Sequence, residues 1–301
     1  MAFRLHPEES VSRGLRRLAR KELRTARRRL HRHSPPTDEA VHKARTSLKK
    51  VAAIAGVLQA GGARGIGGFD KHRRRANKIL STVRDSAANV EILHKLKDAN
   101  PSLISAYRLR RLQQRLQQRR RKARRDVREH DGWRTVEREL RRLRKQAARW
   151  RPKHRHFKAL AAGIRRSYRS GREALRRAQR RQDASDFHDL RQQIKQLWYA
   201  LRLLEAGGRG VRQDVATLHS LESWLGDDHN IVVLTTELSS DRSICQGLVD
   251  VDQLRLAGHR VQCQLRSKAL HGAQRFYRRR AAAYVQRLAR AWLASQQHQA
   301  R

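Results

Sequence analysis

The sequence predicts an all-α protein, and two observations carry the prediction. Apolar residues recur three and four positions apart along most of the chain, as on one face of an amphipathic helix, whereas alternating strand patterns are scarce. Proline, which interrupts helices, occurs only five times, each where a helix is expected to begin or end: Pro7, Pro35, Pro36, Pro101 and Pro152.

The first half is expected to form four helices, near 8–32, 37–59, 68–96 and 101–131. Thr37 is a favourable N-cap for the second helix, where Asp38 and Glu39 suit the positive end of the helix dipole. The second and fourth segments each carry an apolar stripe of helical period: Val41, Ala44, Leu48 and Val51, and Leu109, Leu112, Leu116 and Val127.

The second half is expected to form four more helices, near 154–180, 184–205, 211–239 and 250–296. The apolar run at 231–234 is too short to outweigh its helical flanks. We therefore expect no sheet in this half.

The second half repeats the first. The segment AVHKARTSLKKVAAIAGVLQAGGARG (40–65) aligns with DFHDLRQQIKQLWYALRLLEAGGRG (186–210). At nearly the same offset, SRGLRRLARKEL (12–23) resembles AAGIRRSYRSGR (161–172), and LSTVRD (80–85) aligns with LGDDHN (225–230). Such matches predict a tandem duplication with its joint near Pro152. We expect two four-helix bundles, 1–150 and 151–301, related by an approximate two-fold axis and forming one module.

The charge of the chain is strongly unbalanced. Its 71 Lys and Arg against 27 Asp and Glu give a net charge of +44, so self-repulsion opposes a compact state unless an anion gathers on the surface. Apolar residues make up 38% of the chain, enough to bury a core, which excludes a disordered polyelectrolyte. We therefore expect a polyanionic partner.

Cysteine usage and hydropathy exclude other classes. Cys245 and Cys263 are the only cysteines, which argues against a disulfide scaffold or a thiolate zinc site and fits a reducing compartment. The uncharged stretch at 51–63 is too short to span a bilayer, and the N-terminal residues lack the apolar region of a secretory signal. We expect a soluble, cytoplasmic protein with no membrane partner.

Two rows of cationic side chains form the candidate binding site. The spacing i, i+3, i+7 places three side chains on one helix face, and both halves keep the same three residue types: His42, Arg45 and Lys49, and His188, Arg191 and Lys195. Arg forks and the point donors of Lys and protonated His suit phosphate oxygens. Since an imidazole titrates near pH ~6.5, we expect His42 and His188 to tighten anion binding as the pH falls from about 8 to 6.

The preceding helix of each half carries a pair of arginines at i, i+4, namely Arg16 and Arg20, and Arg165 and Arg169. Because consecutive helices lie side by side in a bundle, both helices are expected to line one groove. The remaining arginines, such as those at 119–125, are expected to be solvated.

No catalytic residues, metal ligands or cofactor are expected. The order of residues shows no Ser/His/Asp set and no carboxylate pair, and the glycines at 61–68 lack the Gly-Lys-Ser/Thr ending of a P-loop. Asp227, Asp228 and His229 resemble a metal cluster, but these acids are expected to pair with nearby arginines.

The cation rows, together with LRRLARKEL at 15–23 and WLGDDHNIVVL at 224–234, resemble the CHAD family, the histidine-bearing α-helical domain. The resemblance extends from about Phe3 to Trp292. It implies a double four-helix bundle whose basic central groove binds inorganic polyphosphate without chemistry. It assigns this binding to the two rows and, secondarily, to Arg16, Arg20, Arg165 and Arg169. Some members carry an additional triphosphatase-type domain; the strands of such a domain are missing here, so a stand-alone module is expected.

The leading hypothesis is therefore a non-enzymatic polyphosphate-binding protein, which the resemblance further associates with polyphosphate granules. One alternative is an architectural DNA- or RNA-binding protein, since a charge of +44 holds nucleic acid non-specifically. A second is a metal-dependent phosphohydrolase centred on Asp227, Asp228 and His229. Nothing in the sequence indicates a protein partner.

Overall fold

The computed structural model describes residues 3–6, 8–32 and 35–297, without the side chains at 84–88 and 120. Within these residues the protein is all-α, as predicted. It contains ten α-helices and three short 3-10 helices, and its only β-type pairing is an isolated bridge between Arg64 and Arg151. None of the helices in the described part combines the length and the apolar character needed to cross a membrane.

Five helices lie in the first half: α1 (Val11–His31), α2 (Asp38–Ala60), α3 (Phe69–Ala99), α4 (Ala106–Glu129) and α5 (Gly132–Ala148). The 3-10 helix η1 (Pro101–Leu103) separates α3 from α4. Thr37 caps α2 as predicted, because its hydroxyl accepts a hydrogen bond of 3.2 Å from the backbone N–H of Ala40.

Five helices also lie in the second half: α6 (Lys158–Arg181), α7 (Ala184–Arg202), α8 (Arg209–Ser240), α9 (Val251–Phe276) and α10 (Ala281–Gln297). The 3-10 helices η2 (Glu205–Gly207) and η3 (Arg242–Ile244) precede and follow α8. In chain order the helices have 21, 23, 31, 24 and 17 residues in the first half and 24, 19, 32, 26 and 17 in the second. Both halves thus place their longest helix third.

The expectation of four helices in each half is wrong. Segment 132–148 forms α5, and the segment expected as one helix over 250–296 divides into α9 and α10. At the second break, the hydroxyl of Tyr168 donates to the carbonyls of Phe276 and Arg279, at 3.1 and 3.2 Å. These bonds satisfy carbonyl groups at the end of α9. Because the partner is a tyrosine distant in sequence, the break is not marked by a local proline or glycine.

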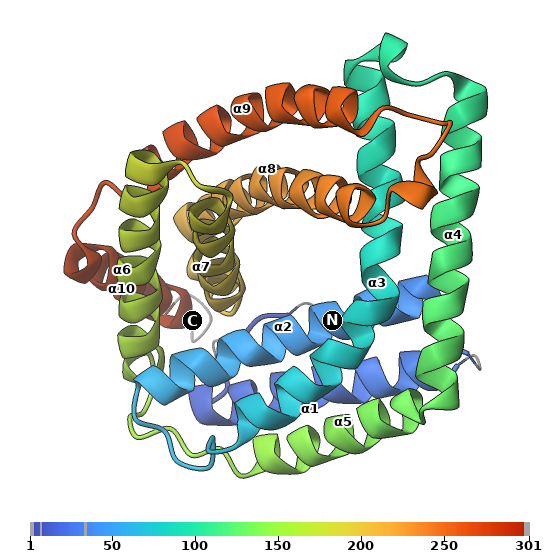
Figure 1. The fold of residues 1–301 in the computed structure, drawn as a ribbon. Coiled ribbons are helices and arrows are strands. Elements are labelled where there is room, and N and C mark those ends of the chain that lie inside the picture. The colour runs from blue at the N-terminus through green and yellow to red at the C-terminus, as the bar shows by residue number, and fades with distance from the viewer. Residues whose placement is uncertain (1–2, 7, 33–34, 298–301) are drawn as a thin grey trace.

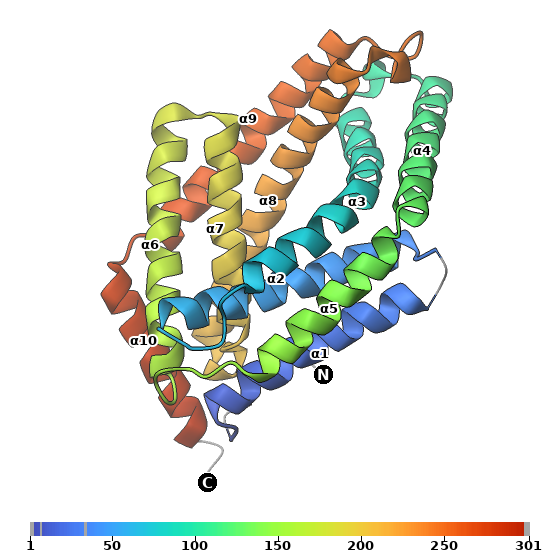
Figure 2. The same ribbon diagram turned by 60° about the horizontal axis from the view of Figure 1, so that its bottom comes forward.

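The helices are arranged in an inner ring and an outer layer. The inner helices α2, α3, α8 and α7 contact one another in that order, and α7 returns to α2. Outside this ring lie α1 and α5 next to α2 and α3, α4 next to α3, α9 next to α8, and α6 next to α7 (Figure 1). From below, α10 packs beside α6 at the edge of the molecule (Figure 2). Each half of the chain contributes two of the four inner helices.

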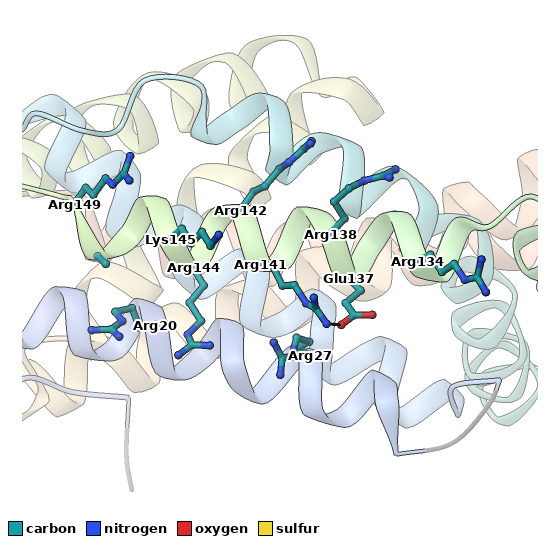
Figure 3. A pocket seen from close by; sticks show the side chains of 11 residues that line it. Arg20, Arg27, Arg134, Glu137, Arg138, Arg141, Arg142, Arg144, Lys145 and Arg149 are labelled. Carbon is teal, nitrogen blue, oxygen red and sulfur yellow. Dashed lines mark hydrogen bonds and ion pairs between the residues drawn. The ribbon is translucent and has the colours of Figure 1, made fainter.

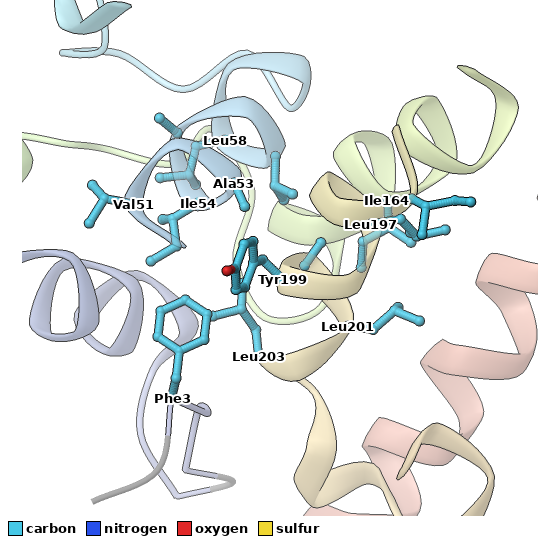
Figure 4. Packing of buried hydrophobic residues seen from close by; sticks show 14 of the residues in the cluster. Phe3, Val51, Ala53, Ile54, Leu58, Ile164, Leu197, Tyr199, Leu201 and Leu203 are labelled. Atoms are coloured by element: carbon cyan, nitrogen blue, oxygen red, sulfur yellow. The ribbon is translucent and has the colours of Figure 1, made fainter. Parts of the chain in front are cut away.

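Two apolar cores hold the ring, and each draws on both halves of the chain. The larger core joins the N-terminal segment and α2 to α6 and α7: Phe3 and Tyr199 meet edge to face near Ile54, and Ile164 packs beside Leu197 (Figure 4). The smaller core joins α3 and α4 to α8 and α9, through Ile92, Leu93, Leu112, Ile231 and Leu254. Burial of these side chains therefore stabilises the contact between the halves as well as each half.

The halves approach each other closely where α6 crosses α2. A Cβ atom added to Gly163 would lie 2.4 Å from the Cα of Val57, closer than any real contact. The backbones of the two helices therefore meet directly, and only glycine permits this separation.

We predict that Gly163→Ala lowers the free energy of unfolding by about 1 to 3 kcal/mol. The methyl group would push α6 away from α2, and this overpacking exceeds the gain of about 1 kcal/mol that alanine brings to a helix. Urea unfolding followed by circular dichroism measures the change. The matched control is Gly210→Ala in α8, where an added Cβ meets only the end of the Arg287 side chain. If both variants unfold at the parent's midpoint, the close crossing does not constrain the fold.

Candidate functional site

A cavity of about 310 Å³ lies at the centre of the inner ring. Its lining comes from the four inner helices only: His42, Arg45, Thr46 and Lys49 on α2, Glu91 and Lys95 on α3, Arg191 and Lys195 on α7, and Glu222, Ser223, Gly226, Asp227, His229, Asn230 and Val233 on α8. The structure thus brings five of the six residues of the two predicted cation rows to a single cavity, and only His188 is outside its lining.

Lys49 experiences the strongest electrostatic effect at this site. Burial is the main cause that lowers its pKa from 10.5 to about 7, and the positive charges of Lys195, Arg45 and Arg191 add to it. Burial and Arg191 also lower the pKa of Lys195, although Glu222 opposes the shift. With a pKa near 7, this lysine is only about half charged at neutral pH.

Glu222 is the carboxylate that partly compensates these cations. Its Oε1 forms a short ion pair with Lys195 and lies 3.4 Å from a guanidinium nitrogen of Arg191. The negative charge of Glu222 also raises the pKa of Lys49, but burial and the neighbouring cations lower it by more. One carboxylate thus interacts with three cations of the site, Lys195, Arg191 and Lys49.

The two histidines at the rim of the site behave as a neutral pair. Nδ1 of His188 lies 3.1 Å from Nδ1 of His229, and the ring centroids are 4.3 Å apart. Burial lowers the pKa of both rings, with Arg191 contributing, and that of His229 reaches about 4. One ring nitrogen can donate to the other only while at least one ring is neutral. His188 therefore does not supply the charge expected of it near neutral pH.

The segment at 224–234 lies in the middle of α8, where its side chains reach three neighbouring helices. Gly226 leaves room for the guanidinium of Arg191, which would lie 3.5 Å from an added Cβ. Asp227 accepts from Lys95 Nζ of α3 at 2.8 Å through both carboxylate oxygens. His229 contacts His188 of α7.

Asp228 points to the outer layer. It is buried, with 2% of its surface exposed, and accepts from Arg266 Nε of α9 at 2.7 Å. Burial raises the pKa of this carboxyl and Arg266 opposes the rise. The guanidinium of Arg266 lies over the ring of Phe187 in α7, 4.5 Å from its centroid. This chain of contacts ties α7, α8 and α9 together.

Asp227, Asp228 and His229 consequently face three different partners, and in the described residues no three His, Cys, Asp or Glu side chains are placed to hold a metal ion. The interpretation that these acids pair with nearby arginines is confirmed for Asp228, whose partner is Arg266, whereas Asp227 pairs with a lysine, Lys95. These two ion pairs hold α8 against α3 and α9.

The four secondary arginines do not line this cavity, which corrects the expectation of one shared groove. Arg16 donates to the carbonyl of Trp150 at 3.4 Å, and Arg20 lines a different groove between α1 and α5. Arg165 and Arg169 are exposed on α6. The physical reason is that α1 and α6 lie in the outer layer, so their polar faces turn away from the ring.

Among the lining residues that the sequence did not single out are Glu222, Lys95 and Asn230. Glu222, Gly226 and Asn230 are spaced i, i+4, i+8, so they share one face of α8 with the LGDDHN motif. That spacing is the signal that would have found Glu222 and Asn230. Lys95 has no such signal, because only the contact between α3 and α8 brings it to the cavity.

The comparisons with known proteins agree with this architecture. The family model of the CHAD domain matches residues 66–239, from just before α3 to the end of α8. The chain belongs to the CHAD domain family. The solved structures include a similar fold, described as "Crystal structure of the CHAD domain from the plant Ricinus communis". It is 16% identical to this CHAD domain, with a TM-score of 0.63 over 92% of this chain and 95% of the other. No curated protein matches the chain.

Membership in the family is consistent with the site. CHAD domains are generally binding modules without catalytic activity. The Ricinus communis domain supports the fold alone at this level of identity, so the chemistry of the cavity is argued from this chain's own residues.

We predict that Lys49→Met raises the free energy of unfolding of the ligand-free domain by about 1 to 4 kcal/mol at pH 7. The folded pKa lies below the unfolded pKa, so the unfolded chain binds more protons between pH 7 and about 10.5. Stability of the parent therefore rises with pH in this window, and the variant loses that slope. Urea unfolding at pH 7, 8 and 9 measures both effects. A parent and variant with equal stability at each pH would show that Lys49 is an ordinary lysine.

Proposed function

We propose that this CHAD domain binds inorganic polyphosphate in the ring cavity without chemical conversion. The observation that carries the proposal is Lys49, which is half-buried close to Lys195, Arg45 and Arg191 and has its pKa lowered to about 7. An anion in the cavity would remove the repulsion among these cations and return Lys49 to its charged form. Binding of an anion is thus favoured by the unfavourable placement of several cations close together.

A chain of phosphates suits this cavity better than other polyanions. No Phe, Tyr or Trp is among the lining residues, so bases have no surface on which to stack. A duplex, whose major groove alone is about 12 Å wide, exceeds a cavity of about 310 Å³. Phosphate oxygens accept from Arg forks and Lys ammonium groups, which are the donors present.

The two halves are proposed to be a tandem duplication, with 1–150 and 151–301 as its units. The matching order of helix lengths supports this, as does the use of one cation row from α2 and its counterpart from α7. A single ligand chain in contact with both rows gains the second row intramolecularly, at high effective concentration. The duplication therefore makes one bivalent site. A cytoplasmic location at polyphosphate granules follows as part of the same proposal.

Replacing Arg45, Lys49, Arg191 and Lys195 together with Gln is predicted to weaken polyphosphate binding at least about 100-fold. Hydrogen bonds to charged groups contribute about 1.5 to 3 kcal/mol each, and the variant loses several of them. The matched control replaces four exposed arginines of α4, Arg110, Arg111, Arg121 and Arg125, with Gln. Calorimetric titration at physiological salt measures both affinities, and circular dichroism checks the helicity.

Equal losses in the two variants would indicate diffuse attraction to the whole surface and would contradict a site in the ring. If the quadruple variant does not fold, the single variant Lys49→Met tests the same site. A loss for Lys49→Met that exceeds the loss for Arg121→Gln supports the proposal, and equal losses contradict it.

The affinity for polyphosphate is predicted to fall by up to about tenfold per unit as the pH rises from 7.5 to 9. The pKa of Lys49 is about 7 in the free domain, and nearby phosphates raise it, so binding takes up a proton in this range. An ordinary imidazole is already neutral there and cannot produce the slope.

Lys49→Arg is the control for this effect, because arginine stays charged at every pH tested. The variant should bind polyphosphate with a flat pH profile. A parent profile that is itself flat, or an unchanged slope in Lys49→Arg, would assign the proton uptake elsewhere.

A further inference from the structure

A second basic groove lies outside the ring, between α1 and α5. It has a volume of about 980 Å³, and nine of the 11 residues that line it are Arg or Lys. Arg141 and Arg144 point from α5 toward Arg20 and Arg27 of α1 (Figure 3). None of the residues that line the groove belongs to the lining of the ring cavity.

The groove has almost no negative charge of its own. Glu137 is its one acidic residue, and that carboxylate is already paired with Arg141 and with His31, whose Nε2 lies 2.9 Å away. Burial lowers the pKa of Arg144, and Arg24, Arg20 and Arg27 add to the shift. Two more lining arginines have carboxylate partners, Arg142 with Glu139 at 3.3 Å and Arg134 with Asp131 at 3.6 Å. The nine cations still outnumber these three acids, and an anionic partner would supply the missing negative charge.

The lining chemistry favours contact with phosphates rather than with bases. No aromatic side chain lines the groove, so a single strand finds no stacking surface. The lining also lacks Asn and Gln, the side chains that recognise adenine. Guanidinium groups bind phosphate through paired donors.

The dimensions favour a wide, rigid polyanion. Helix α5 has 17 residues and is therefore about 25 Å long, over which duplex DNA carries about 15 phosphates. The groove is about three times the volume of the ring cavity and lies between two helices of the outer layer. A narrow phosphate chain would leave most of its cations without contact.

We propose that the groove between α1 and α5 binds duplex DNA through the phosphate backbone, without sequence preference and independently of the ring cavity. The inference does not rest on the proposed function, because the two sites share no residue. A domain with both sites would link a phosphate chain in the ring to DNA on its outer face.

The test compares three variants of the full chain in binding to a fluorescent duplex of about 20 base pairs, at several salt concentrations from 50 to 200 mM. The groove variant carries R27Q, R134Q, R141Q and R144Q. The α4 control variant (R110Q, R111Q, R121Q and R125Q) and the ring variant (R45Q, K49Q, R191Q and K195Q) lose the same number of charges elsewhere. Single-stranded DNA of equal length and polyphosphate are titrated in parallel.

The groove variant should lose at least about tenfold in duplex affinity at 50 mM salt. Its slope of log K against log salt should fall by about one unit for each lost phosphate contact. Its polyphosphate binding should stay within about twofold of the parent, and the α4 and ring variants should keep duplex affinity. Should the groove variant fold poorly, R134Q, R138Q, K145Q and R149Q remove four exposed charges of the same groove.

Equal duplex losses in the groove and α4 variants would overturn the proposal, as would tighter binding of single-stranded DNA than of the duplex. Loss of duplex binding in the ring variant would show that there is one shared site. Loss of polyphosphate binding in the ring variant alone, with duplex affinity insensitive to the groove, would leave the proposed function standing and reject this inference.

Discussion

Repulsion among cations inside a closed ring of helices is the interaction on which the rest of this structure depends. Arg45 and Lys49 from α2 meet Arg191 and Lys195 from α7, with Glu222 as the carboxylate between them. Such a cluster is unfavourable in itself, so the helices that carry it must be held by other contacts. Two apolar cores, each built from both halves of the chain, supply these other contacts. The direct backbone contact of Gly163 with Val57 fixes the position of α2. The fold keeps the cations together, and under the proposed function an anion completes the site.

The motif at 224–234 shows how one helix organises such a site. Gly226 admits Arg191, Asp227 fixes Lys95, Asp228 anchors Arg266 of the outer layer, and His229 pairs with His188. The acids therefore position cations, and the histidines stay neutral through burial and the charge of Arg191. The residue types that suggest metal or acid–base chemistry serve packing and electrostatics here. Charge near neutral pH is instead regulated by Lys49.

Local patterns predicted the fold class, the bounds of α2 and the two cation rows, because helical period and capping depend on neighbours in sequence. The rows converge as expected from their repetition in both halves. The division of α9 from α10 depends on Tyr168, more than 100 residues away, and no local pattern reveals it. Arg16 and Arg20 have the correct spacing but lie on an outer helix, and spacing alone does not tell which face turns to the ring. Lys95 reaches the cavity only through the packing of α3 on α8, which is likewise invisible in the sequence.

The most direct measurement is the titration of the Lys49 ammonium by NMR in the free domain and with tripolyphosphate, with its signal assigned by its loss in Lys49→Arg. The account predicts a pKa of about 7 in the free domain and a clear rise when the phosphate binds. A pKa near the ordinary value of ~10.4 in the free domain would contradict it, because the cations would then not be crowded. So would a pKa near 7 that does not move with phosphate, since the anion would then bind elsewhere.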